Sequence, residues 1–391
     1  MADPTTVSRI TPIPTFVYAL MFGLAAACGP DSPTRPNGSG TGSDSLRIAD
    51  SIRVADSIRV ADSTRVADSL ATLSPPPPDS TPPGGTPPPA VPDSLAWPDN
   101  IPARTYTGLP FGDFHTPSTG FKPPYSGALL ALSRKDLIQV LAAAHAQGMR
   151  VVISLAGRRN RYTINGKFDF SRWKARIDTY KHFKFDAYVK AGTIIGHYLV
   201  DEPFCSACWG GTKITLDQLE EMARYSKSLW PLMPTGIRAA PSHLGTSKFS
   251  SLDFAWAQWE GPLHVPSYRM SAEEFRDVEI SAAKNLGLGL VFGLNYLDAG
   301  DGSSHVDGTY AHDPQLSDGE YCHPRGCYRY MMSVSEIKHV GGVFAGASYG
   351  CALLNWQYDP AFLSRAGVSD ALREIAGVAE KRPLTSCKGS H

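Results

Sequence analysis

The sequence predicts an α/β fold in which eight parallel strands close into a (β/α)8 barrel, the TIM barrel. From about residue 101 short apolar runs alternate with amphipathic helical stretches, and this alternation is typical of a parallel sheet covered by helices. Eight such runs can be counted, which favours a closed barrel over the alternative of an open sheet. The runs begin at Thr105, Gly127, Met149, Ile194, Thr235, Leu252, Leu288 and Cys351.

Capping signals justify the helices between these runs. Ser133 is the predicted N-cap of a helix that ends at Gly148, and residues 170–190 read as one long helical region. Three later helices open with a capping box, in which two side chains satisfy the first backbone donors of the helix. The boxes are Thr215-x-x-Gln218, Ser271-x-x-Glu274 and Ser333-x-x-Glu336.

Length and charge limit the classes of partner. The chain has 391 residues and 42% hydrophobic content, enough for one barrel of about 250 residues plus a tail. Lys and Arg number 37, as do Asp and Glu, so the charge footprint of a nucleic-acid binder is missing. We expect a monomer that binds a small ligand or a neutral polymer and no nucleic acid.

Residues 1–28 have the pattern of an export signal. Arg9 precedes an apolar run over residues 16–27 that is short for a membrane span, and small residues lead into Cys28. This ending resembles the lipobox of bacterial lipoproteins, although Leu24 stands one position early. The resemblance implies lipidation of Cys28 and a cell-envelope location; the alternative is an ordinary signal peptide and a secreted protein.

Residues 29–98 show no core-forming pattern and predict a linker. Residues 45–68 repeat a hexad four times, and residues 75–98 are rich in proline, which favours an extended chain. This segment would separate an anchor from the barrel, which we assign to residues 99–391.

Six cysteines remain when Cys28 is set aside. An even number fits disulfide pairing in an oxidising compartment. The alternative is a four-thiolate zinc site built from the first two pairs. The pairs we predict are Cys205 with Cys208, Cys322 with Cys327, and Cys351 with Cys387.

Acidic and aromatic residues follow several predicted strands. Asp201 and Glu202 close the strand from Ile194, and Pro203 stops it. Carboxyl ends of parallel strands share one face, where barrels place their chemistry. Because adjacent strand residues face opposite ways, we expect Asp201 to bind a hydroxyl or orient a neighbour. The other candidates on this face are Gln258, Trp259, Glu260, Asn295, Asp298, Trp356, Tyr358 and Asp359.

Carboxylates beside aromatic rings suit carbohydrate, because sugar rings stack on aromatic faces while paired carboxyl groups cleave the glycosidic bond. Asp201-Glu202-Pro203 resembles the Asn-Glu-Pro motif of the large clan of barrel glycoside hydrolases. The resemblance implies that Glu202 is the general acid/base and that Trp356 lies beneath the sugar. The clan's nucleophile is a glutamate after strand seven, where this chain has Asp298, so Asp298 or Glu260 is the second carboxylate and the stereochemistry stays open.

Other functions fit parts of the pattern. The barrel could bind glycans without catalysis, or act as a metal-dependent hydrolase through His197, Asp201 and Glu202, although we expect no metal or cofactor. Asp201 and Glu202 could also form a structural ion pair with Arg238. The cationic cluster over residues 157–161 could meet an acidic sugar or solvate a loop. No HExxH motif is present in the sequence, which argues against a zincin.

Overall fold

A computed structural model describes residues 97–261, 270–301, 321–323, 326–328, 331–383 and 385–390. The predicted export signal with Cys28, and the predicted linker up to residue 96, lie outside the described residues. No helix in the described part of the chain is long and apolar enough to cross a membrane.

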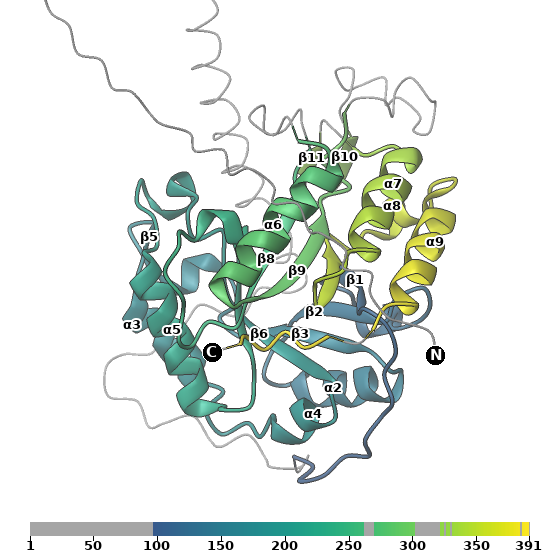
Figure 1. The fold of residues 1–391 in the computed structure, drawn as a ribbon. Helices are drawn as coiled ribbons and strands as arrows, with labels where there is room; N and C mark the ends of the chain where they lie inside the picture. The colour runs from purple at the N-terminus through teal and green to yellow at the C-terminus, as the bar shows by residue number, and fades with distance from the viewer. Residues whose placement is uncertain are drawn as a thin grey trace, which may run out of the picture. The chain divides into compact units, whose positions relative to one another are not determined.

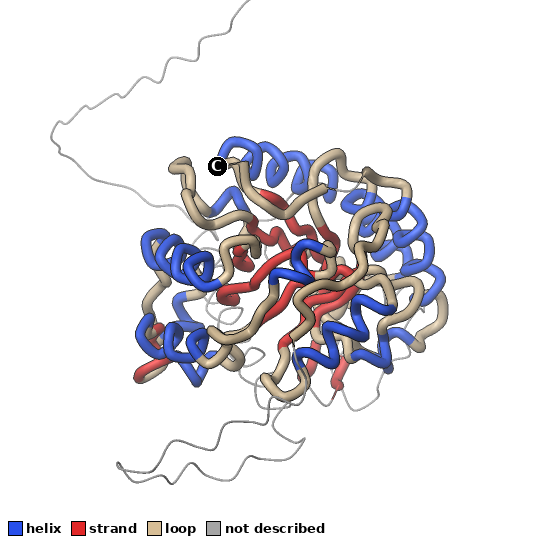
Figure 2. The backbone as a smooth tube through the Cα atoms, turned by 90° about the horizontal axis from the view of Figure 1, so that it is seen from below, coloured by secondary structure: helices blue, strands red, loops and turns tan. Residues whose placement is uncertain are grey.

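The predicted (β/α)8 barrel is confirmed. Eight parallel strands close on themselves in the order β1-β12-β9-β8-β7-β6-β3-β2, and helices surround them (Figure 1). Seen from below, the strands lie in the middle with the helices around them (Figure 2). The strands are β1 (Phe111–Phe114), β2 (Gly127–Ala131), β3 (Arg150–Ser154), β6 (Ile194–Asp201), β7 (Thr235–Arg238), β8 (Phe254–Trp259), β9 (Gly289–Leu294) and β12 (Ala352–Asn355).

The first strand differs from its prediction. Residues 105–109 form no strand, and the barrel opens instead with Phe-Gly-Asp-Phe over β1. Gly108 has φ +70°, and Leu109 N donates to Ala379 O at 2.8 Å, so this segment is a connector tied to the last helix. Glycine and aspartate are uncommon in strands, which is why the apolar pattern missed β1.

The three predicted capping boxes are confirmed, because each box has both of its reciprocal hydrogen bonds. The predicted helical region over 170–190 divides into two helices. Ser133 is not an N-cap: its helix begins at Leu137, and the Ser133 hydroxyl donates to Asp136. The helices are α2 (Leu137–Ala146), α3 (Phe170–Asp178), α4 (Asp186–Lys190), α5 (Leu216–Leu229), α6 (Ala272–Leu286), α7 (Val334–Ala345), α8 (Pro360–Leu363) and α9 (Val368–Glu380).

Short elements lie in the loops. The 3-10 helices are η1 (Ser118–Gly120), η2 (Arg159–Tyr162), η3 (Ser206–Trp209) and η4 (Pro241–His243). Two antiparallel pairs join β4 (Thr163–Ile164) to β5 (Lys167–Phe168) and β10 (Tyr321–His323) to β11 (Gly326–Tyr328).

The core has two layers, one inside the barrel and one between strands and helices. Inside the barrel, Phe254 occupies space left by two glycines of neighbouring strands. A Cβ atom at Gly236 would lie 2.1 Å from the Phe254 ring, and one at Gly196 would lie 2.5 Å from it. The sheet therefore closes tightly around this ring, below the carboxyl ends of the strands.

The predicted Cys351–Cys387 disulfide is present, with an S–S distance of 1.99 Å. Cys351 immediately precedes β12, and Cys387 belongs to the segment after α9. Gly389 N donates to Asp253 Oδ1 at 3.2 Å, which holds the same segment under β8. The disulfide thus fastens the C-terminal segment to the end of the barrel opposite the candidate site.

Asp113 lies at the seam where β1 meets β12 and is fully buried. The Tyr125 hydroxyl donates to one carboxylate oxygen at 2.5 Å, and Asn355 Nδ2 donates to the other at 3.3 Å. Burial outweighs these hydrogen bonds and raises the pKa of Asp113 from 3.8 to about 6. The seam therefore holds a carboxyl group that ionises at a cost in stability.

We predict that Asp113→Asn removes a pH dependence of stability. Between pH values of about 4 and 6 the folded chain keeps a proton that the unfolded chain releases, so the wild-type free energy of unfolding falls as pH rises. The full loss is about 3 kcal/mol, from about 1.4 kcal/mol per pKa unit. Urea unfolding of the wild type and of Asp113→Asn at several pH values measures the free energy of unfolding of each protein. A constant difference between them across this range would contradict the prediction.

Candidate active site

A cavity of about 650 Å³ opens at the carboxyl ends of the strands. It is the expected place for a site in a parallel barrel. The structure brings most of the predicted residues together here. Those that line the cavity are Asp201, Glu202, Gln258, Glu260, Asn295, Asp298 and Trp356.

The backbone turns at Glu202, which has φ +44°. A non-glycine residue rarely adopts this left-handed conformation, and such strain concentrates at functional sites. Because the chain leaves the extended conformation here, Asp201 and Glu202 line the same cavity. The expectation that they face opposite ways is therefore wrong, since alternation holds only within a strand.

Arg238, at the end of β7, joins the two carboxylates. Its Nε donates to Asp201 Oδ1 at 2.5 Å and its Nη2 lies 2.8 Å from Glu202 Oε1. Its Nη1 donates to Gln258 Oε1 at 2.7 Å. The ion pair of Asp201 and Glu202 with Arg238, which was the structural alternative, is therefore present. It lies inside the cavity, so it fixes both carboxylates at the mouth of the barrel.

Opposing effects act on Asp201. Burial alone would raise its pKa, but the Arg238 guanidinium and the Tyr198 hydroxyl, which donates at 2.6 Å, hold the pKa below its ordinary value. The two carboxylates raise the pKa of Arg238 well above its ordinary range despite burial. Asp201 is therefore a charged anchor for Arg238 and not a proton donor.

A second arginine meets Glu202 from the loop after β3. Arg159 Nη2 lies 3.6 Å from Glu202 Oε2, and the Arg159 guanidinium stacks 4.7 Å from the centre of the Trp209 ring. Trp209 Nε1 donates to the carbonyl oxygen of Glu202 at 2.8 Å. Both the backbone and the side chain of Glu202 are thereby held in place.

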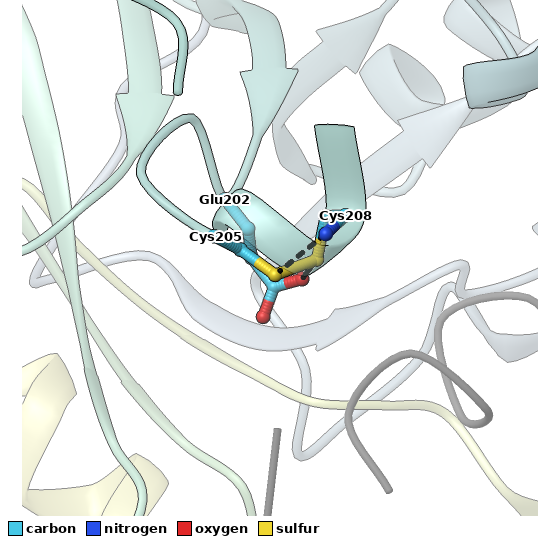
Figure 3. A group of neighbouring side chains, drawn as sticks. All are labelled: Glu202, Cys205 and Cys208. Atoms are coloured by element: carbon cyan, nitrogen blue, oxygen red, sulfur yellow. Dashed lines mark hydrogen bonds between the residues drawn. A yellow bond between two sulfur atoms is a disulfide. The ribbon is translucent and has the colours of Figure 1, made fainter. Parts of the chain in front are cut away.

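The predicted Cys205–Cys208 disulfide is present, with an S–S distance of 2.00 Å. It lies against Glu202 (Figure 3), and Cys208 Sγ is 3.5 Å from Glu202 Oε2. Ligand atoms of the three residues lie within 4.8 Å of one another, but two of them are sulfurs bonded to each other. The zinc alternative therefore lacks its first two thiolates, and the disulfide braces the loop that carries Glu202.

The third predicted disulfide is only partly described. Cys322 and Cys327 are backbone partners across β10 and β11, as a short bridge requires. Their side chains lie outside the described residues, so this pairing stays a prediction.

Trp356 is one of the aromatic residues that line the cavity and is partly buried. Behind it, Trp256 is buried and stacks on Phe114 with ring centroids 4.2 Å apart. Arg238 Cζ lies 5.4 Å from the ring centroid of Trp256 and 5.4 Å from that of Trp356. One tryptophan is thus core and the other offers a face to a ligand.

Three predicted substrate-binding residues lie elsewhere. Trp259 packs outward against Phe275 of α6 with ring centroids 5.4 Å apart, because its neighbour Gln258 takes the cavity side. Asp359 is buried and caps α8 by accepting from Ala361 N at 2.9 Å. Tyr358 packs beside Tyr125 in the outer core. None of the three is among the described residues that line the cavity.

His197 cannot support the metal-dependent alternative. Its ring is buried beside Trp230, and Nδ1 lies 2.7 Å from Ser226 Oγ of α5. Burial lowers its pKa to about 3, so the ring is neutral. It therefore lies in the layer between barrel and helix, away from Asp201 and Glu202.

Sequence reasoning missed two arginines of the cavity, Arg134 and Arg176. Arg134 follows β2 and Arg176 lies on α3, so neither belongs to the cluster at residues 157–161. Only the folded barrel brings them to that cluster.

No family model matches the chain, and no curated protein matches it. Solved structures similar to it include xylanase XynB from Paenibacillus barcinonensis, at 11% identity and TM-score 0.42 over 70% of this chain and 96% of that one. A putative glycoside hydrolase from Parabacteroides distasonis has 9% identity and TM-score 0.44, with 71% and 95% covered. The family 30 xylanase Xyn30A from Clostridium acetobutylicum has 10% identity and TM-score 0.42, with 71% and 73% covered. Because likeness at 9–11% identity shows the fold alone, we infer the reaction from the side chains of the cavity.

A double-mutant cycle tests the ion pair. We predict that Arg238→Gln and Asp201→Asn couple by about 2 kcal/mol in the free energy of unfolding, because each change leaves a partly buried charge without its partner. The control is the exposed ion pair of Arg373 with Asp370 on α9, for which coupling below about 1 kcal/mol is expected. Equal coupling in the two cycles would show that Arg238 does not hold the site together.

Proposed function

We propose that the protein is a glycoside hydrolase that cleaves a polysaccharide or oligosaccharide by carboxylate acid/base catalysis. One observation carries the proposal: Glu202, Glu260 and Asp298 lie in the segments that follow β6, β8 and β9, and they line one cavity beside Trp356. Hydrolysis of a glycosidic bond needs two carboxyl groups on either side of the bond, and a sugar ring stacks on an aromatic face.

The mechanism assigns a role to each group. Glu202 is the general acid/base that exchanges a proton with the glycosidic oxygen, and Asp298 or Glu260 attacks the anomeric carbon or activates water. Asp201 positions Arg238. Gln258 and Asn295 offer hydrogen bonds to hydroxyl groups from β8 and from the residue after β9.

Arg238 sets a condition on this mechanism. Its Nη2 lies 2.8 Å from Glu202 Oε1, so the ion pair occupies one carboxylate oxygen of Glu202. A substrate that moves Arg238 toward Asp201 and Gln258 alone would free this oxygen to meet the glycosidic oxygen. The other two hydrogen bonds of Arg238 supply that resting position.

The same contact favours a second candidate, a glycan-binding barrel without catalysis. If Arg238 never releases Glu202, the cavity can hold a sugar over Trp356 but cannot transfer a proton. The hydrolase and the glycan-binding barrel would both bind a glycan, but only the hydrolase would form cleavage products.

We also propose export with a lipid anchor at Cys28, on the strength of the N-terminal sequence pattern. Two disulfides among the described residues are consistent with an oxidising compartment. Incorporation of labelled palmitate, lost in Cys28→Ser, is the measurement for the anchor.

The catalytic prediction concerns Glu202→Gln, Glu260→Gln and Asp298→Asn. Glu202→Gln lowers kcat for release of reducing sugar by roughly 100-fold to 10,000-fold, because a proton donor and acceptor is lost. One of the other two variants falls by a similar factor, and the anomer of the first product shows whether the mechanism retains or inverts. The assay is reducing-sugar release from a glycan panel.

Asp277→Asn is the matched control, since Asp277 is an exposed carboxylate on α6 outside the cavity. Its activity should equal that of the wild type. Binding of glycans by the wild type and by Glu202→Gln, with no product from either, would overturn the hydrolase and select the binding protein.

A further inference from the structure

One side of the cavity is lined by arginines. Six arginines of the described chain line it, against four carboxylates. Two of the six, Arg159 and Arg238, are those already paired with Asp201 and Glu202. The other four are named here the arginine wall: Arg134, Arg158, Arg161 and Arg176.

Among the described residues, the arginine wall has no acidic partner. In the same part of the chain, the ion pairs of the cavity involve Arg159 and Arg238, and none involves a member of the wall. The whole chain has equal numbers of basic and acidic residues, 37 of each. The wall is therefore a local excess of positive charge and not part of a generally basic surface.

The members of the wall lie close together although they come from three segments. Arg134 follows β2, Arg158 and Arg161 follow β3, and Arg176 lies on α3. A Cβ atom at Gly157 would lie 3.7 Å from Arg176 Nη2 and 3.8 Å from Arg161 Cδ. Arg176 Nε donates to Ala156 O at 3.3 Å, which holds its guanidinium at the cavity.

The pKa of Arg176 also indicates that the positive charges of the wall lie close together. Burial and the positive charge of Arg161, together with that of Arg134, lower the pKa of Arg176. Like charges gathered in a concave site raise the local potential for an anion. Guanidinium groups present a planar fork that matches a carboxylate or a sulfate ester.

The wall begins beside the candidate catalytic group. Arg158 directly precedes Arg159, and Arg161 lies two residues after it; Arg159 Nη2 is 3.6 Å from Glu202 Oε2. An anionic group held by the wall would therefore belong to a sugar in the same cavity as Glu202.

We propose that the glycan bound in this cavity is anionic, and that the arginine wall binds its carboxylate or sulfate groups. This inference rests on the proposed function for the identity of the ligand as a sugar. It narrows the substrate class to uronic acid-containing or sulfated glycans, and it decides between the two interpretations of residues 157–161.

Calorimetry on the full protein tests the inference with matched ligands. The probes are oligogalacturonate with its carboxyl-reduced counterpart, and a sulfated galactan oligosaccharide with its desulfated counterpart. We expect at least one anionic probe to bind at least about tenfold more tightly than its neutral counterpart, with a difference that shrinks in high salt. The arm that shows the difference identifies carboxylate or sulfate as the recognised group.

The variant is Arg134→Gln combined with Arg161→Gln, two exposed side chains whose replacement should leave the fold intact. It should lose most of the preference for the anionic probe and keep the affinity for the neutral one. Arg224→Gln is the control, because Arg224 is exposed on α5 outside the cavity. Equal binding of anionic and neutral probes by the wild type, or an unchanged preference in the double variant, would overturn the inference.

The outcomes separate this inference from the hydrolase proposal. Tight binding of an anionic glycan without product would leave the arginine wall standing and remove the hydrolase. Cleavage of glycans by both the wild type and the double variant, with no preference of either for the anionic probe over its neutral counterpart, would leave the hydrolase standing and remove the arginine wall.

Discussion

The site depends on one constraint, the turn of the chain at Glu202 and its closure by Arg238. A strand that stayed extended would send Asp201 and Glu202 to opposite faces of the barrel. The left-handed conformation at Glu202 puts both into the cavity, and Arg238 from the neighbouring strand compensates their charges. Two adjacent carboxylates at a partly buried rim would otherwise repel each other.

The rest of the fold supports this arrangement from two sides. Trp209 and the Cys205–Cys208 disulfide hold the loop after β6 against Glu202. Below them, Trp256 stacks on Phe114 and gives Arg238 an aromatic surface to lie against. At the other end of the barrel the Cys351–Cys387 disulfide ties down the C-terminal segment. Rigid elements therefore position the functional groups, as precise chemistry requires.

Much of this was predictable because it depends on local pattern. Strand and helix alternation gave the barrel, three capping boxes gave the starts of α5, α6 and α7, and the runs of β6 and β8 gave the carboxyl ends where Glu202 and Glu260 lie. The prediction of the first strand failed, because Gly112 and Asp113, residue types that are depleted in strands, interrupt the apolar pattern of β1, which pairs with β2 and β12.

The site was less predictable because it depends on geometry that no local pattern encodes. Alternation failed at Asp201 because the strand ends there. Trp259 and Asp359 have the right residue types, but one faces the helices and the other caps a helix. The arginine wall gathers residues from three segments, and only residues 157–161 gave a sequence signal for it.

The decisive experiment for the role of Glu202 is a crystal structure of Glu202→Gln with a bound oligosaccharide. We expect a sugar ring on Trp356 and a glycosidic oxygen within about 3 Å of the substituted side chain at position 202, the distance of a hydrogen bond. We also expect Asp298 or Glu260 on the opposite side of that bond, with Arg238 still on Asp201. An oligosaccharide bound away from Trp356, or with no acidic side chain facing position 202 across the sugar, would rule out Glu202 as the general acid/base.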